Sequence, residues 1–143
     1  MESVPASIAS ANPQRPGDPV APVTILVVED EVLVRLMISE YLREFGYTVV
    51  EAKNAEQATR ILRSEKSVQV VFSDVRMPGE MNGLGLAQWI KQNKPGVGVV
   101  LTSAHLTQAE FLDGTSGSGD LVRKPYAPGE VLQRIRALTG RMA

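Results

Sequence analysis

The chain has 143 residues, about the length of one compact domain, and its 43% hydrophobic and 22% charged residues exclude disorder of the whole chain. Fifteen basic against sixteen acidic residues give a net charge of -1, which argues against binding to nucleic acid or to an anionic membrane. The absence of cysteine excludes disulfides and thiol chemistry, and a single histidine excludes a multi-histidine metal site.

Residues 1–22 differ from the rest of the chain in composition. Five prolines lie there among Ser, Ala, Asn and Gly, with neither a helical nor a strand period. Such a segment cannot bury enough apolar surface to offset its ordering entropy, so it predicts a flexible tail before a folded domain over residues 23–140. It lacks the basic and apolar regions of a signal peptide, and no apolar run approaches the ~20 residues of a membrane span. We therefore expect a cytoplasmic protein without a membrane partner.

Short apolar runs alternate with amphipathic stretches from Val23 onward. The apolar runs predict five strands, at residues 23–28, 47–51, 68–72, 97–101 and 121–123. The helical patterns cover residues 31–45, 54–64, 83–93, 107–113 and 128–139. Five strand–helix units in series, joined by right-handed crossovers, predict an α/β protein with a doubly wound five-stranded parallel sheet and helices on both faces.

The helix expected over residues 31–45 carries apolar side chains on two sides. On a wheel of about 100° per residue, the larger cluster is Val34, Met37, Ile38, Tyr41 and Phe45. We expect this cluster to pack on the core. Val32 and Leu36 point nearly opposite, beside the acidic residues that begin the helix, and we expect them to be exposed and available to a partner.

Polar side chains end four of the expected strands. Glu29 and Asp30 follow the first strand, Asp74 the third, Thr102 the fourth and Lys124 the fifth. In a doubly wound sheet, ligands bind outside the carboxyl ends of the strands. Three clustered carboxylates repel one another without a cation among them, and oxygen ligands with open positions suit Mg²⁺ or Mn²⁺. A carboxylate such as Asp74 can also act as a nucleophile and form an aspartyl-phosphate, whose oxygens Lys124 and Thr102 could bind.

These residues lie in motifs that resemble the receiver domain of two-component response regulators, of the single-domain chemotaxis type. The motifs are Glu29-Asp30, Ser73-Asp74 with Met77-Pro78-Gly79, Asn82-Gly83, Thr102-Ser103 and Lys124-Pro125-Tyr126. The resemblance covers residues 23–139 and implies the (βα)5 flavodoxin-like receiver fold.

The resemblance implies a role for each residue of the expected site. Asp74 becomes the phosphoacceptor, and Glu29, Asp30, Asp74 and the backbone carbonyl of Arg76 become the ligands of Mg²⁺. Thr102 becomes the switch hydroxyl and Lys124 the phosphoryl-binding lysine. Receivers usually hold the Lys–Pro peptide bond that follows in the cis form.

The function that the resemblance implies is phosphorelay signalling. We expect a stand-alone response regulator that accepts a phosphoryl group on Asp74 from a histidine kinase or a phosphotransfer protein. In the family, the first helix and the loop after the fifth strand, here residues 126–128, dock on the helical bundle that presents the phosphohistidine. Since no DNA-binding or enzymatic segment follows, we expect no nucleic-acid partner, no enzyme activity beyond self-phosphorylation and self-dephosphorylation, and output by contact with an unidentified protein.

Two other classes of protein fit parts of the pattern. A Mg²⁺-dependent phosphatase of the aspartyl-phosphate type usually carries a second acid two residues after the nucleophile, where this chain has Arg76. A flavin-binding module would need a phosphate-cradling loop rich in Ser, Thr and Gly after the first strand, where this chain has Glu29-Asp30-Glu31. A colourless purified protein would exclude the flavin alternative.

Overall fold

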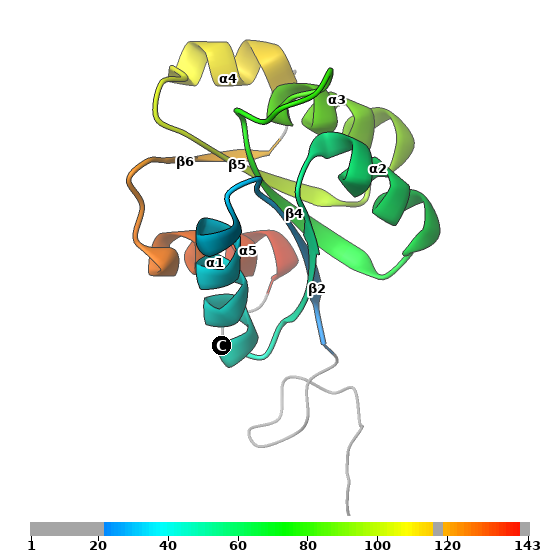
Figure 1. Ribbon diagram of the computed structural model, residues 1–143, viewed down its shortest axis with the longest axis vertical. Coiled ribbons are helices and arrows are strands. Elements are labelled where there is room, and N and C mark those ends of the chain that lie inside the picture. The colour runs from blue at the N-terminus through cyan, green and yellow to red at the C-terminus, as the bar shows by residue number, and fades with distance from the viewer. Residues whose placement is uncertain (1–21, 116–118, 141–143) are drawn as a thin grey trace, which may run out of the picture.

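The computed structural model describes residues 22–115 and 119–140, which fold into one parallel sheet covered by helices (Figure 1). The elements in chain order are β2 (Thr24–Val28), α1 (Val32–Glu44), β3 (Thr48–Ala52), α2 (Ala55–Ser64), β4 (Val68–Asp74), α3 (Gly83–Asn93), β5 (Gly98–Ser103), α4 (Gln108–Thr115), β6 (Asp120–Arg123) and α5 (Pro128–Thr139). The strand order β3-β2-β4-β5-β6 confirms the doubly wound five-stranded fold. The tail expected over residues 1–22 lies outside the described residues, residue 22 excepted.

The sheet separates two hydrophobic cores, and strand β2 contributes side chains to both. Its Leu26 and Val28 face the core beneath α2, α3 and α4, and its Ile25 and Val27 face the core beneath α1 and α5. All five residues of β2 are buried, because helices cover both faces of the sheet. This two-sided burial is the reason that β2 is a continuous apolar run in the sequence.

Local hydrogen bonds explain where α2 and α4 begin. The Asn54 side chain accepts from the Gln57 N–H at 2.8 Å at the start of α2, where the helical pattern of residues 54–64 begins. Before α4, the Thr107 hydroxyl accepts from the Glu110 N–H at 3.1 Å, while the Glu110 carboxylate accepts from the Thr107 N–H at 2.8 Å. These bonds lower the pKa of Glu110. This capping box and the buried ring of Phe111 order the helix that follows, despite the nearby glycines.

The core face expected for α1 was wrong in part. Met37 and Phe45 are 52% and 47% exposed, whereas Ser39 and Leu42 are fully buried beside Ile38. The helix therefore turns a narrower face toward β2 and β3, centred on residues spaced three and four apart.

The outward apolar side of α1 is larger than the sequence indicated. Val32 and Leu36 are exposed as predicted, and Leu33 and Met37 lie exposed beside them. We call these four residues the α1 apolar patch. It lies at the start of α1, next to the carboxyl edge of the sheet.

Candidate functional site

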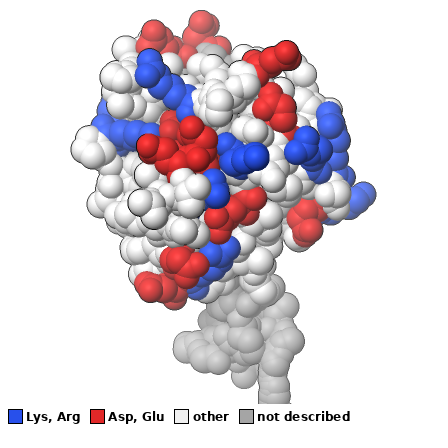
Figure 2. Space-filling model, viewed as in Figure 1, with Lys and Arg blue, Asp and Glu red and all other residues white. Residues whose placement is uncertain are grey.

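Three carboxylates meet where β2 and β4 end. Val28 of β2 pairs with Ser73 of β4, so Glu29 and Asp74 follow on neighbouring strands at the same edge. Glu29, Asp30 and Asp74 each offer an oxygen, and these oxygens lie within 4.8 Å of one another. Glu29 and Asp74 are only 5% and 6% exposed, while Asp30 is open to solvent. Figure 2 shows acidic side chains gathered over the start of α1, with basic side chains on both sides.

Asp74 is held by two donors from different parts of the chain. The ammonium of Lys124 lies 2.7 Å from its Oδ2, and the Arg76 N–H donates to its Oδ1 at 3.1 Å. Burial alone would lower the pKa of Lys124, but its hydrogen bond and ion pair with Asp74 outweigh burial and raise it. Lys124 is therefore a cation placed directly against the carboxylate that the sequence singles out as nucleophile. The Lys124–Pro125 peptide bond is cis, as the resemblance implies.

Thr102 lies beside Asp74 with its hydroxyl unpaired. The two residues are register partners in β4 and β5, and Thr102 is 1% exposed. Its Oγ1 has no hydrogen-bond partner among the residues that the structure describes. A buried hydroxyl without a partner is costly, so this one is available for a group that binds at Asp74.

Negative charge in the site is not fully compensated by the protein. Burial raises the pKa of Glu29 to about 7; the Glu31 N–H bond opposes this rise, and the charge of Asp74 adds to it. Burial, with the charges of Glu29 and Asp74, raises the pKa of Tyr126 to about 12. Both pKa shifts have the same causes, which are partial removal from solvent and the negative charge of neighbouring carboxylates. A cation with oxygen preference, such as Mg²⁺, fits this donor set.

The backbone of α3 comes very close to β4 next to Asp74. A Cβ at position 83 would overlap the Asp74 carbonyl oxygen, and the Gly83 N–H donates to the Val75 carbonyl at 2.9 Å. Asn82 caps the helix through a 2.9 Å bond from the Gly85 N–H. Asn82-Gly83 thus fastens the loop that follows Asp74 to the sheet.

An arginine that the sequence did not single out also reaches the site. Arg35, in the second turn of α1, donates from Nη1 to the carbonyl of Glu29 at 2.8 Å. On the helical wheel it lay off the core side, where most basic residues are solvated. The only sequence signal was its position one turn after the acidic residues.

An apolar groove of about 390 Å³ opens beside the carboxylates. Val34 and Met37 of α1 line one side, and Ala104, Pro125 and Tyr126 line the other. Glu31 and Lys124 are also part of its lining. The groove therefore connects the edge of the carboxylate site with the α1 apolar patch.

A doubly wound sheet with an acidic cluster and a lysine at its carboxyl edge is suited to a phosphate-handling protein. The family model of the response regulator receiver domain matches residues 25–136, and the chain belongs to that family. The family acts in two-component phosphorelay signalling, and receiver domains generally bind Mg²⁺ at an acidic site. Membership favours the receiver over the phosphatase and flavin alternatives.

Curated relatives and solved structures agree with this assignment. The chain is 36% identical over 121 residues to the probable transcriptional regulatory protein TcrX of Mycobacterium tuberculosis, covering 84% of this chain and 51% of that protein. It is 33% identical over 123 residues to the transcriptional regulatory protein AruR of Pseudomonas aeruginosa, covering 82% and 50%. The chain thus spans about half the length of these relatives.

The fold matches a solved receiver structure closely. A response regulator receiver protein from Sinorhizobium medicae superposes with a TM-score of 0.77 at 22% identity, over 83% of this chain and 95% of the other.

Among the described residues, no helix is both long and apolar enough to cross a membrane.

Proposed function

We propose that this chain is a response regulator receiver that accepts a phosphoryl group on Asp74 from a histidine kinase or a histidine phosphotransfer protein. The observation that carries the proposal is the surroundings of the Asp74 carboxylate. One oxygen touches the Lys124 ammonium, and the Thr102 hydroxyl, which has no partner among the described residues, is on the neighbouring strand. Oxygens of two further carboxylates, Glu29 and Asp30, lie within 4.8 Å of an Asp74 oxygen. Such a site combines a nucleophile, donors for phosphoryl oxygens and a place for a divalent cation.

The proposed step transfers one phosphoryl group between two side chains. A carboxylate oxygen of Asp74 attacks phosphorus as the bond from phosphorus to the imidazole nitrogen of the donor breaks. The bonding electron pair stays on that nitrogen. The imidazole ring of the donor leaves as the neutral form, either because its other nitrogen already carries a proton or because it takes one up. Lys124 then neutralises phosphoryl oxygens, and the Thr102 hydroxyl donates to one of them.

Glu29, Asp30, Asp74 and the backbone carbonyl of Arg76 are the proposed ligands of Mg²⁺, with Mn²⁺ as a substitute. A bound divalent cation supplies charge neutralisation, without which an anionic phosphoryl donor would meet three carboxylates. The nearby Arg76 N–H already bonds Asp74, so the backbone of this loop lies against the site.

The proposed docking surface for the phosphoryl donor is the α1 apolar patch together with the groove beside it. Val32 and Leu33 are 55% and 80% exposed, and the groove brings apolar side chains of α1 up to Lys124. A helical bundle that presents a phosphohistidine would cover these side chains as it brings phosphorus to Asp74. Burial of exposed apolar surface at such a contact is favourable.

Output is proposed to occur by contact with a further protein, from one receiver unit formed by residues 23–140 in the cytoplasm. One supporting observation is the net charge of -1, which disfavours binding to nucleic acid. The other is that the residues of the site are suited to accepting a phosphoryl group, which is the chemistry of a signalling receiver. The named relatives are transcriptional regulators, and the match spans about half of each, so absence of a nucleic-acid partner is a proposal for this chain alone.

The test is phosphorylation with acetyl phosphate and Mg²⁺, read by intact-mass spectrometry. We expect one added phosphoryl group on the unmodified chain, none on Asp74→Asn, and none when Mg²⁺ is removed with a chelator. Asp113→Asn is the matched control, because Asp113 is an exposed carboxylate on α4. Undiminished labelling of Asp74→Asn would overturn the assignment of the phosphoacceptor.

A further inference from the structure

The loop that carries Glu29 and Asp30 leads into α1 without the usual side-chain cap at the helix start. Glu31 occupies the N-cap position without a side-chain cap bond, and the first turn of the helix contains no acidic residue. Instead, Glu29 Oε2 accepts from the Glu31 N–H at 3.1 Å. The same carboxylate that would bind a cation therefore also closes the helix start, and a cation would compete for it. The loop needs another anchor if its geometry is to persist when the cation binds.

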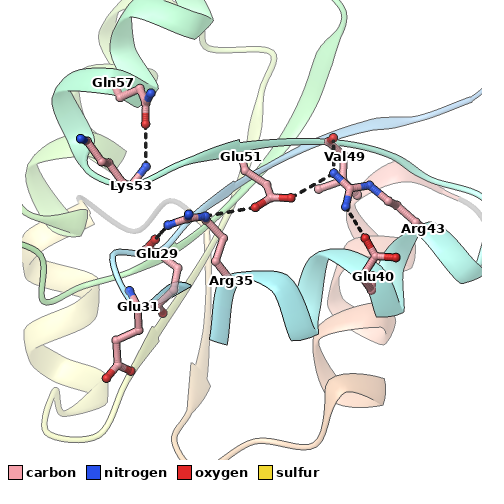
Figure 3. Close-up of polar contacts among 9 residues, drawn as sticks. All are labelled: Glu29, Glu31, Arg35, Glu40, Arg43, Val49, Glu51, Lys53 and Gln57. Carbon is pink, nitrogen blue, oxygen red and sulfur yellow. Dashed lines mark hydrogen bonds and ion pairs between the residues drawn. The ribbon is translucent and has the colours of Figure 1, made fainter. Parts of the chain in front are cut away.

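Arg35 supplies an anchor that leaves both carboxylates free. Its Nη1 donates to the Glu29 carbonyl at 2.8 Å, while its Nε lies 3.0 Å from Glu51 Oε1 on β3 (Figure 3). On the other side, the Glu29 N–H donates to the Ala52 carbonyl at 3.0 Å. The main chain of Glu29 is thus fixed at both its N–H and its carbonyl. The N–H bonds β3 directly, and the carbonyl is connected to β3 through Arg35 and Glu51.

Glu51 is itself held in place by a second arginine. Arg43 donates from Nη2 to Glu51 Oε2 at 3.1 Å and to the Val49 carbonyl at 3.1 Å, and from Nη1 to Glu40 at 2.7 Å. In Figure 3 the Glu51 carboxylate lies between the two guanidinium groups. The side chains of Arg35 and Glu51 are only 18% and 23% exposed, so solvent screens this pair less than a surface pair. The guanidinium of Arg35 therefore has one preferred position.

We propose that Arg35, fixed by Glu51, is a positioning residue that holds the Glu29–Asp30 backbone in the geometry a divalent cation requires. This inference rests on the proposed function, since it concerns the same metal site. The carbonyl of Glu29 belongs to the peptide that joins Glu29 to Asp30, so rotation of this peptide would move both carboxylates relative to Asp74. Residues that orient metal ligands from behind typically change metal affinity by about tenfold or more when removed.

The charge of Arg35 weakens binding of a cation, whereas its hydrogen bond to the Glu29 carbonyl favours that binding. A guanidinium near the site repels a cation, and Glu51 largely cancels this repulsion because the two form an ion pair. Removing Arg35 alone would therefore mix loss of position with loss of repulsion. A double variant, Arg35→Met with Glu51→Met, removes the anchor and leaves the net charge unchanged.

The experiment measures Mg²⁺ affinity by titration calorimetry on the full chain. We expect the Arg35→Met, Glu51→Met variant to bind Mg²⁺ about tenfold more weakly than the unmodified chain. The matched control is Asp120→Met with Arg134→Met, which also removes one ion pair at constant net charge but touches neither Glu29 nor Glu51. We expect its affinity to change less than about twofold.

A second variant separates the hydrogen bonds from general packing. Arg35→Lys keeps the charge, but one ammonium cannot reproduce the planar fork that reaches Glu51 and the Glu29 carbonyl together. We expect its Mg²⁺ affinity to fall between those of the unmodified chain and the double variant. Thermal melting without Mg²⁺ shows whether the two double variants are folded to the same extent. Labelling by acetyl phosphate should recover in the Arg35→Met, Glu51→Met variant at saturating Mg²⁺.

The outcomes distinguish this inference from the proposed function. Mg²⁺ binding that is normal in the unmodified chain and unchanged in the Arg35→Met, Glu51→Met variant would overturn the positioning role alone. Equal weakening in both double variants would overturn it as well, because a general loss of stability would then be the cause. If the unmodified chain binds no Mg²⁺, the proposed metal site is overturned and the positioning role with it. The same follows if the Asp30→Asn variant binds Mg²⁺ with the same affinity as the unmodified chain.

Discussion

The Lys124 ammonium and the Asp74 carboxylate are 2.7 Å apart, although 50 residues separate them in the chain. They meet because β4 and β6 flank β5 in a parallel sheet, so both residues lie at the same edge. In this structure the ammonium occupies one oxygen of the carboxylate. A phosphoryl group or a cation at Asp74 therefore either binds the other oxygen, Oδ1, or shares Oδ2 with the ammonium.

The first prediction concerns Lys124→Met. We expect labelling by acetyl phosphate to slow by at least about tenfold, because a donor to the phosphoryl oxygens is lost. Mg²⁺ affinity should rise in the same variant, since one positive charge has left a site with three carboxylates. Lys66→Met, at an exposed position, is the control for the loss of charge. Weaker Mg²⁺ binding would contradict the opposition between Lys124 and the cation.

The second prediction concerns pH. Burial raises the pKa of Glu29 from 4.5 to about 7, so between these values the metal-free folded chain holds a proton that the unfolded chain has lost. Within that window, this group makes the free energy of unfolding fall as pH rises. Mg²⁺ must displace the proton, so its apparent affinity should increase roughly tenfold between about pH 6 and pH 8. Calorimetry across this range checks the prediction. In Glu29→Gln the weaker binding that remains should vary little over the same range.

The third prediction concerns docking on the α1 apolar patch. Val32→Ser combined with Leu36→Ser should reduce phosphoryl transfer from the cognate kinase by about tenfold or more, because two apolar contacts leave the interface. Labelling by acetyl phosphate should stay unchanged, since a small donor needs no docking surface. Leu112→Ser on α4 is the control, because Leu112 is also an exposed apolar side chain. Equal loss of both activities would indicate damage to the site, and loss of neither would contradict docking here.

The fourth prediction compares two glycines. Gly83→Ala should lower the free energy of unfolding by about 1–3 kcal/mol, because the added Cβ would overlap the Asp74 carbonyl oxygen and force the backbone apart. Gly96→Ala should be neutral or slightly stabilising, because nothing lies within 4 Å of a Cβ there. Urea denaturation of both variants measures the difference. Equal effects at the two positions would show that the contact between α3 and β4 is not tight.

The strands and most helices could be predicted from the sequence because their signals are local. The run at residues 23–28 is apolar at every position, and Asn54 caps α2 through a residue three positions later. Thr107 and Glu110 carry an equally local signal for the start of α4, whose helical pattern the sequence also shows. The meeting of Asp74 and Lys124 was also predictable, since parallel strands place their carboxyl ends at one edge.

The face that α1 turns inward could not be read from its apolar residues. Apolar side chains lie all around this helix, so several faces are nearly equivalent on a wheel. Packing against β2, β3 and α5 selects the face with Ile38 and Leu42, and it leaves Met37 and Phe45 exposed. The sequence identifies the helix, whereas its neighbours determine its rotation.

The sequence by itself determined the elements, their order and the residues at the carboxyl edge of the sheet. Only the tertiary structure decided that Arg35 and Arg43 converge on Glu51 and that Arg35 reaches the Glu29 carbonyl. The reason is that apolar period and strand ends follow from neighbours along the chain. An arginine side chain is long and flexible, and its partners depend on how a helix and a strand 16 residues away are placed in space.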